Sequence, residues 1–138
     1  MHVLVPLDDS DPARDALEHA IETYPDAEIT ALHVLNPPTA LYGASSQSSV
    51  DRLIDLEESA AEELLESAEQ LADEHDASVT TELLVGSPAR AIVSFASEND
   101  VDQIVLGSHG RSGVSRVLLG SVAESVVRRA PVPVTILR

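Results

Sequence analysis

Two glycine clusters near the end of the chain are the residues best suited to hold an anion. The first is Gly107-Ser108-His109-Gly110, and the second, Gly120-Ser121, follows Gly110 after nine residues. Glycine allows positive φ and lets backbone N–H groups approach a ligand closely. Ser121 opens a helical pattern, so its hydroxyl lies beside free N–H groups and the positive end of a helix dipole. The spacing Gly-x2-Gly-x9-Gly-Ser therefore predicts a phosphate cradle.

The charge around these glycines differs from that of the rest of the chain. Residues 1–100 contain 22 acidic residues and three arginines, whereas residues 101–138 contain two acidic residues and five arginines. Arg111 and Arg116 lie between the two glycine clusters. This local excess of positive charge favours the same interpretation.

Simpler interpretations of the glycines stay open at this point. They can serve only to turn the chain, and Ser121 can serve only as a helix cap. The segment is not a P-loop, because the chain contains no lysine. It is also not the dinucleotide pattern Gly-x-Gly-x-x-Gly, which follows the first strand of its fold.

Histidines and aspartates are weaker candidates for chemistry. His109 lies within the glycine loop and could touch a ligand or a partner chain, but no companion base or nucleophile is evident. Asp8, Asp9 and Asp11 suggest a metal cluster, although a helix-start cap explains Asp11 more simply. The other histidines are expected to be structural or exposed: His2, His19, His33 and His75.

Hydrophobic periodicity predicts the elements that position these residues. Short aliphatic runs predict strands at 2–7, 29–35, 79–85, 103–106 and 132–137. Helical spacing predicts helices after Pro12, from Val50 to about His75, after Pro88 and from near Ser121. The expected buried side of the second helix is Val50, Leu53, Ile54, Leu64, Leu65, Ala68, Leu71 and Ala72.

This βαβαβαβαβ order predicts an α/β fold. We expect one domain over residues 1–138, with an open, doubly wound sheet of five mainly parallel strands. Ligands of such sheets bind at the switch point, beyond the carboxyl ends of the strands. Residues 6–10 and 107–121 follow the first and fourth strands, so they are expected to meet there.

Composition narrows the class of protein. The net charge of −16 argues against nucleic-acid binding, and the lack of cysteine excludes disulfides and thiolate metal sites. No apolar run approaches 18 residues and no leader is visible, which predicts a cytoplasmic protein without a membrane partner. Because aliphatic residues are abundant, the acidity indicates a hydrated surface suited to high salt, and hence a halophilic origin.

The chain resembles a single-domain universal stress protein of the subgroup that binds ATP. The resemblance rests on Val5-Pro6-Leu7-Asp8, Leu32-His33-Val34, Gly86-Ser87-Pro88 and the run from Gly107 to Glu124. The family's nucleotide motif, Gly-x2-Gly-x9-Gly-Ser/Thr, is complete here, and members without it generally do not bind ATP. The resemblance implies a Rossmann-like fold of the adenine nucleotide alpha hydrolase-like kind.

The resemblance also implies a role for each matching residue. The triphosphate would be held by residues of the glycine loop and the following helix start: Gly107, Gly110, Gly120, Ser121 and the backbone N–H of Val122. Arg111 is added to this site for its positive charge. Pro6 and Asp8 would line the base and ribose side, where a carboxylate suits sugar hydroxyls. Val34 would contact adenine and Leu106 would pack near the sugar. Mg²⁺ or Mn²⁺ would be held mainly by phosphate oxygens, because the loop has no acidic cluster.

These implications predict a regulatory, nucleotide-dependent stress-response protein that binds ATP, or ADP or AMP. The alternative is a slow ATP hydrolase or phosphotransferase with Arg111 or Arg116 as a charge clamp, but no base is visible. A module like an electron-transfer flavoprotein or a nucleotide transferase is a third possibility, although its partner domains are missing.

The last strand suggests how two copies would associate. Pro131 and Pro133 stand at its start, and proline is tolerated in sheets mainly at edges or first positions. The uncharged segment 134–137 is therefore an expected edge strand that needs cover. We expect a homodimer that pairs this strand across a twofold axis, as the resemblance also implies.

Overall fold

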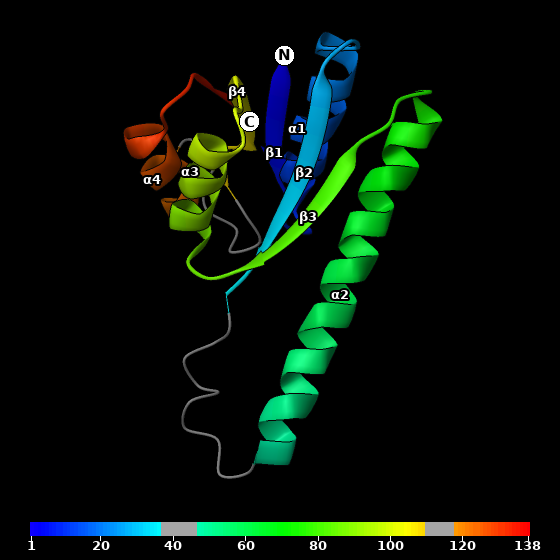
Figure 1. The fold of residues 1–138 in the computed structure, drawn as a ribbon, viewed down its shortest axis with the longest axis vertical. Coiled ribbons are helices and arrows are strands. Elements are labelled where there is room, and N and C mark those ends of the chain that lie inside the picture. The colour runs from blue at the N-terminus through cyan, green and yellow to red at the C-terminus, as the bar shows by residue number, and fades with distance from the viewer. Residues whose placement is uncertain (37–46, 110–117) are drawn as a thin grey trace.

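The structure, a computed structural model, describes residues 1–36, 47–109 and 118–138. Its elements follow the predicted order and are β1 (His2–Pro6), α1 (Asp11–Thr23), β2 (Glu28–Leu35), α2 (Gln47–Glu74), β3 (Thr80–Val85), α3 (Pro88–Glu98), β4 (Gln103–Gly107), α4 (Ser121–Arg129) and β5 (Val134–Leu137). The strands form one sheet in the order β3-β2-β1-β4-β5, of which Figure 1 labels the first four, and every neighbouring pair is parallel. The predicted α/β sheet is confirmed, and it is parallel throughout.

Helices cover both faces of this sheet. Successive side chains of a strand point to opposite faces, and along β1 the residues Val3 and Val5 join one buried cluster whereas Leu4 joins the other. The first cluster is completed by α1 and α2, and the second by α3 and α4. The sheet is therefore doubly wound, as right-handed crossovers from a central β1 require.

The second helix is longer than the sheet that it covers, and the predicted buried side of this helix is partly wrong. Its 28 residues extend about 42 Å, whereas the 8 residues of β2 extend about 26 Å. The first part of α2 therefore extends past the sheet (Figure 1), and Leu53 and Ile54 are 45% and 37% exposed. Burial begins at Ala61 and continues through Leu71. The side chain of Val50 lies outside the described residues.

The start of α1 is fixed by side chains of the loop after β1. The hydroxyl oxygen of Ser10, the N-cap, accepts a hydrogen bond from the Ala13 N–H at 3.3 Å. The Asp8 carboxylate accepts hydrogen bonds from the Ser10 N–H at 3.0 Å and from the Ser10 hydroxyl. Pro12 lies in the first turn, where a helix needs no N–H donor. The predicted helix start is confirmed, but the cap is Ser10 and not Asp11, which is the first residue of α1.

The last strand lies at an edge of the sheet, as predicted. β5 begins at Val134, two residues later than expected, because Pro131 and Pro133 lack an N–H for the ladder. The Pro133 carbonyl still accepts a hydrogen bond from the Ile104 N–H at 3.0 Å. In the parts of the chain that the structure describes, no helix combines the length and apolar character needed to cross a bilayer.

Candidate functional site

A cavity of about 350 Å³ opens at the carboxyl ends of β1 and β4, where the strand order reverses. Side chains and backbone from both ends of the sequence line it: Pro6, Leu7, Asp8, Ala13, Leu32, His33, Val34, Pro88, Ile92, Leu106, Gly107, His109, Gly120, Ser121, Val122 and Ala123. This is the switch point at which doubly wound sheets bind their ligands.

The β1 side of the cavity holds a carboxylate in a fixed position. Asp8 lies two residues after the end of β1, and one of its oxygens accepts both hydrogen bonds from Ser10. The Leu7 N–H donates to the Leu32 carbonyl at 2.7 Å, which keeps this loop against β2. The second oxygen of Asp8 accepts no hydrogen bond from a described residue, so it can accept one from a ligand hydroxyl.

The β2 side contributes Val34, as expected, and also His33. The His33 ring donates its Nδ1–H to the Leu7 carbonyl at 2.7 Å, because a carbonyl oxygen can only accept. The ring therefore ties β2 to the loop that carries Asp8. The sequence predicts that His33 is structural or exposed, and the structure gives it a structural contact and a place in the cavity wall.

The β4 side is shaped by Gly107. A Cβ atom at this position would lie 2.8 Å from the carbonyl carbon of Pro12 and 3.0 Å from the Ala13 nitrogen. Glycine is therefore needed here so that the end of β4 can touch the first turn of α1. The same contact brings the two loops of the cavity together.

The two glycine clusters meet through the backbone. Ser108 is 2% exposed; its N–H donates to the Leu137 carbonyl, and its own carbonyl accepts from the Gly120 N–H, both at 2.7 Å. A Cβ atom at Gly120 would lie 3.2 Å from the His109 Cα. The hydrogen bond between residues 108 and 120 thus closes the glycine loop and places its ends side by side.

The amino end of α4 opens onto the cavity. Gly120 is its N-cap and makes no side-chain capping bond, so Ser121 is the first helical residue rather than the cap. The N–H groups of residues 121–123 have no partner within the helix, and all three residues line the cavity. Uncapped N–H groups and the positive helix end together form an arrangement that favours an anion.

The structure therefore brings together most of the residues that the sequence singled out: Pro6, Asp8, Val34, Leu106, Gly107, Gly120, Ser121 and Val122. Gly110, Arg111 and Arg116 lie outside the described residues. Sequence analysis missed Pro88, Ile92 and Ala123, because apolar residues on helices carry no signal for a cavity wall. It also underrated His109, which lines the cavity with Nδ1 3.1 Å from the Ser108 hydroxyl oxygen.

The chain matches the model of the universal stress protein family over residues 1–138. A universal stress protein of Methanocaldococcus jannaschii is 35% identical over 138 residues, which cover 99% of this chain and 81% of that protein. The fold resembles a universal stress protein of Lactobacillus plantarum with a TM-score of 0.85 and 29% identity, covering 100% and 97% of the two chains.

A second solved structure is a universal stress protein of Archaeoglobus fulgidus in complex with dAMP. It has a TM-score of 0.71 and 28% identity, and the match covers 100% of this chain and 98% of that one. The family match over the whole length and the shared sheet agree with each other, and we conclude that the chain belongs to the universal stress protein family.

Proposed function

We propose that this protein binds an adenine nucleotide, with ATP as the favoured ligand, in the cavity between β1, β4 and α4. The observation that carries the proposal is the uncapped amino end of α4, which opens onto a cavity at the switch point. The cavity volume, about 350 Å³, falls within the range of small-molecule sites. The dAMP complex of a relative supports an adenine nucleotide as the ligand class.

In this proposal the phosphates lie against the glycine loop and α4. Gly107, Gly110, Gly120 and Ser121 supply the cradle, the Val122 N–H donates to a phosphate, and Arg111 adds positive charge. Asp8 faces the ribose instead, since its free oxygen suits a sugar hydroxyl and would repel a phosphate. Pro6, Val34 and Leu106 then enclose the base and sugar. ADP and AMP would use the same contacts with fewer phosphates.

A divalent ion would be bound mainly through the nucleotide. Among the described residues of the cavity wall, Asp8 is the single carboxylate, and one of its oxygens already accepts from Ser10. Mg²⁺ and Mn²⁺ prefer oxygen ligands, and Mg²⁺ in particular is commonly held by phosphates with few protein ligands. The donor set fits an ion held by phosphate oxygens, and the ion would offset their charge beside an acidic protein.

A regulatory role is favoured over an enzymatic one. Among the described wall residues, Asp8, His33 and His109 are the titratable side chains, and each already has a hydrogen-bond partner within the protein. Phosphoryl transfer needs a group that positions water or an acceptor, together with a charge clamp. A slow ATP hydrolase or phosphotransferase remains the alternative, and single-turnover hydrolysis by purified protein separates the two.

Nucleotide binding is tested by calorimetry with ATP, ADP and AMP in the presence of Mg²⁺. Gly120→Val should abolish binding, because its side chain would crowd the His109 backbone and fill the phosphate site. Arg111→Ala should weaken binding of ATP more than that of AMP, since it removes charge near the outer phosphates. Arg128→Ala is the matched control, because Arg128 pairs with Glu124 on exposed α4 surface. An unchanged ATP affinity in a folded Gly120→Val variant would contradict the proposal.

We also propose that the protein forms a homodimer through β5. The Ile104 N–H donates to Pro133, and the Ser108 N–H donates to Leu137. Alternate residues of a parallel strand face the same neighbour, so the backbone groups of Val134 and Ile136 face the open edge. An antiparallel copy of β5 would pair with them about a twofold axis.

The dimer interface is best tested by a substitution that removes a backbone N–H from the open edge of β5. Val134 and Ile136 are partly buried against the second core cluster, so aspartate there would place a carboxylate beside apolar side chains and destabilise the fold as well as the interface. Val134→Pro removes one outward N–H while keeping an apolar side chain, and it should yield monomers that still bind nucleotide. Light scattering that finds the unmodified protein monomeric at every salt concentration refutes the dimer.

The acidic surface is proposed to be an adaptation to high salt. The net charge of −16 is spread over a chain of 138 residues, and most of the acidic side chains are exposed. Dense salt shortens the range of their mutual repulsion to a few ångströms. A halophilic environment would therefore stabilise the folded state.

A further inference from the structure

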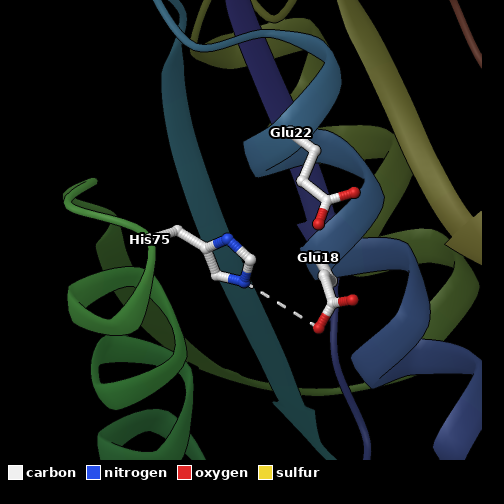
Figure 2. Close-up of side chains that lie close together, drawn as sticks. All are labelled: Glu18, Glu22 and His75. Atoms are coloured by element: carbon white, nitrogen blue, oxygen red, sulfur yellow. Dashed lines mark ion pairs between the residues drawn. The ribbon is translucent and has the colours of Figure 1, made fainter.

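A second cluster of ligand atoms lies far from the nucleotide cavity, at the ends of α1 and α2. Glu18 and Glu22 are one helical turn apart on α1, and His75 follows the last residue of α2. Figure 2 shows the three side chains converging across the gap between the helices, and their ligand atoms all lie within 4.8 Å of one another. None of the three residues lines the cavity described above.

The backbone holds His75 firmly in this position. Asp76 has a φ of 52°, its N–H donates to the Asp73 carbonyl at 3.1 Å, and the Ala77 N–H donates to the Ala72 carbonyl at 2.9 Å. This pair of bonds around a left-handed residue is a Schellman motif, which ends α2 at a defined residue. The motif fixes the backbone of His75 at the end of α2, from which its side chain reaches toward Glu18 of α1.

Among the described residues, no arginine forms an ion pair with this cluster. Two carboxylates one turn apart on a helix repel each other. Within the described residues the one ion pair formed here is between His75 Nε2 and Glu18 Oε2, at 3.9 Å, and Glu22 has no hydrogen-bond or ion-pair partner. The last turns of both α1 and α2 contain no basic residue, although a helix C-terminus carries partial negative charge. Three independent sources of negative potential therefore meet at one point.

We propose that Glu18, Glu22 and His75 form a binding site for a divalent transition-metal ion, with Zn²⁺ as the best match. One imidazole and two carboxylates are a mixed set that Zn²⁺ accepts, whereas Mg²⁺ and Ca²⁺ prefer oxygen ligands alone. Ligand atoms on a tetrahedral Zn²⁺ are about 3.4 Å apart, given bonds of about 2.0–2.2 Å. The side chains of His75 and Glu18 are 29% and 47% exposed, so small rotations close the remaining distance.

The site would join two helices rather than carry out a reaction. Three protein ligands leave one coordination position for water, but Glu22 and His75 are exposed, and none of the three residues lines the cavity at the switch point. An ion bound there would replace the repulsion between Glu18 and Glu22 with attraction and connect α1 to the end of α2. Its expected effect is a higher melting temperature of the nucleotide-free protein.

The test uses the full chain without nucleotide and two metal probes. Co²⁺ is titrated while its visible absorption is followed, and Zn²⁺ is then added to displace it. We expect saturation at one ion per chain, displacement by Zn²⁺, and at least about tenfold weaker binding in His75→Gln and Glu22→Gln. Zn²⁺ should also raise the melting temperature of the unmodified protein more than that of His75→Gln.

His19→Gln is the matched control, because His19 lies on the same helix but its ring contacts Thr23 at 3.4 Å instead of the cluster. Its metal affinity should equal that of the unmodified protein. The proposal is overturned if Co²⁺ binding does not saturate, or if His75→Gln binds Zn²⁺ as tightly as the unmodified protein. It is also overturned if His19→Gln loses as much affinity as His75→Gln, since that pattern describes unspecific binding to an acidic surface.

Discussion

Replacing Gly107 with alanine tests whether the end of β4 is held against α1 by the absence of a side chain. The added Cβ would lie 2.8 Å from the Pro12 carbonyl carbon and 2.9 Å from its Cβ, so backbone of the first turn of α1 would have to move. Overpacking of this kind costs about 1–3 kcal/mol. Alanine also reduces the conformational freedom of the unfolded chain, which stabilises the folded state by about 0.4–1 kcal/mol. Combining these limits, the net loss of folding free energy should lie between about 0 and 2.6 kcal/mol, with a central value of about 1.3 kcal/mol.

The same displacement should reach the ligand. The first turn of α1 is capped by Ser10, which is bonded to Asp8, and Asp8 lines the cavity. A shift of Pro12 therefore changes the position of the carboxylate proposed to face the ribose. We expect Gly107→Ala to weaken nucleotide binding as well as folding, although residue 107 gains only one methyl group.

Urea denaturation of two matched pairs of variants distinguishes a packing clash from backbone strain as the cause of the lost stability. At Gly107, serine should cost more than alanine, because the clash grows with side-chain size. At Gly86 a Cβ would meet nothing within 4 Å, but φ is +151°, so alanine and serine should cost nearly the same through backbone strain. If Gly107→Ala has the midpoint of the unmodified protein, or if serine and alanine are equal at position 107, the packing argument fails.

Three further predictions concern stability. The melting temperature should be higher in molar KCl than in dilute buffer, because salt screens the repulsion between acidic side chains. A melting temperature that stays constant or falls as KCl is added would contradict the proposed halophilic adaptation. Leu71→Ala should lose about 2–5 kcal/mol in urea denaturation, whereas Leu56→Ala, at a position 61% exposed, should change stability by less than about 0.5 kcal/mol. Equal losses would mean that α2 is covered along its whole length. Ser10→Ala should lose about 1 kcal/mol of folding free energy, because α1 loses its N-cap. Calorimetry should also show weaker nucleotide binding, because the Asp8 carboxylate loses the hydrogen bond from the Ser10 hydroxyl. Unaltered binding would mean that the cap does not position Asp8 for the ligand.

Sequence patterns predicted the sheet well because its determinants are local. Aliphatic strands, proline at helix starts and glycine at turns each act within a few residues, and the two segments at the switch point were predicted together from strand order alone. The buried length of α2 was not predictable in this way. Helical spacing continues through Leu53 and Ile54, but periodicity does not indicate where the sheet beneath a helix ends.

The types and spacing of the residues predicted the polar and glycine-bearing parts of the cavity, and the family resemblance added the apolar Pro6, Val34 and Leu106. Gly107 was assigned to the phosphate cradle, yet the structure adds a packing reason that depends on Pro12, which is distant in sequence. Ile92 and Ala123 belong to the wall because two helices happen to converge there. Contacts of this kind follow from tertiary packing and leave no mark on the types or spacing of the residues.

The mismatch in length between α2 and the sheet divides one continuous helix into two parts that differ in local stability. From Ala61 onward, the backbone amides can exchange with solvent only when buried side chains such as Leu71 leave the core. Residues 51–60 can unwind turn by turn without exposing any core, so the free energy of opening should fall steadily toward the start of the helix. Starting a helical turn is costly whereas extending one is not. The packed half therefore acts as the nucleus for the exposed half, and the core stabilises helical structure at residues that it never touches.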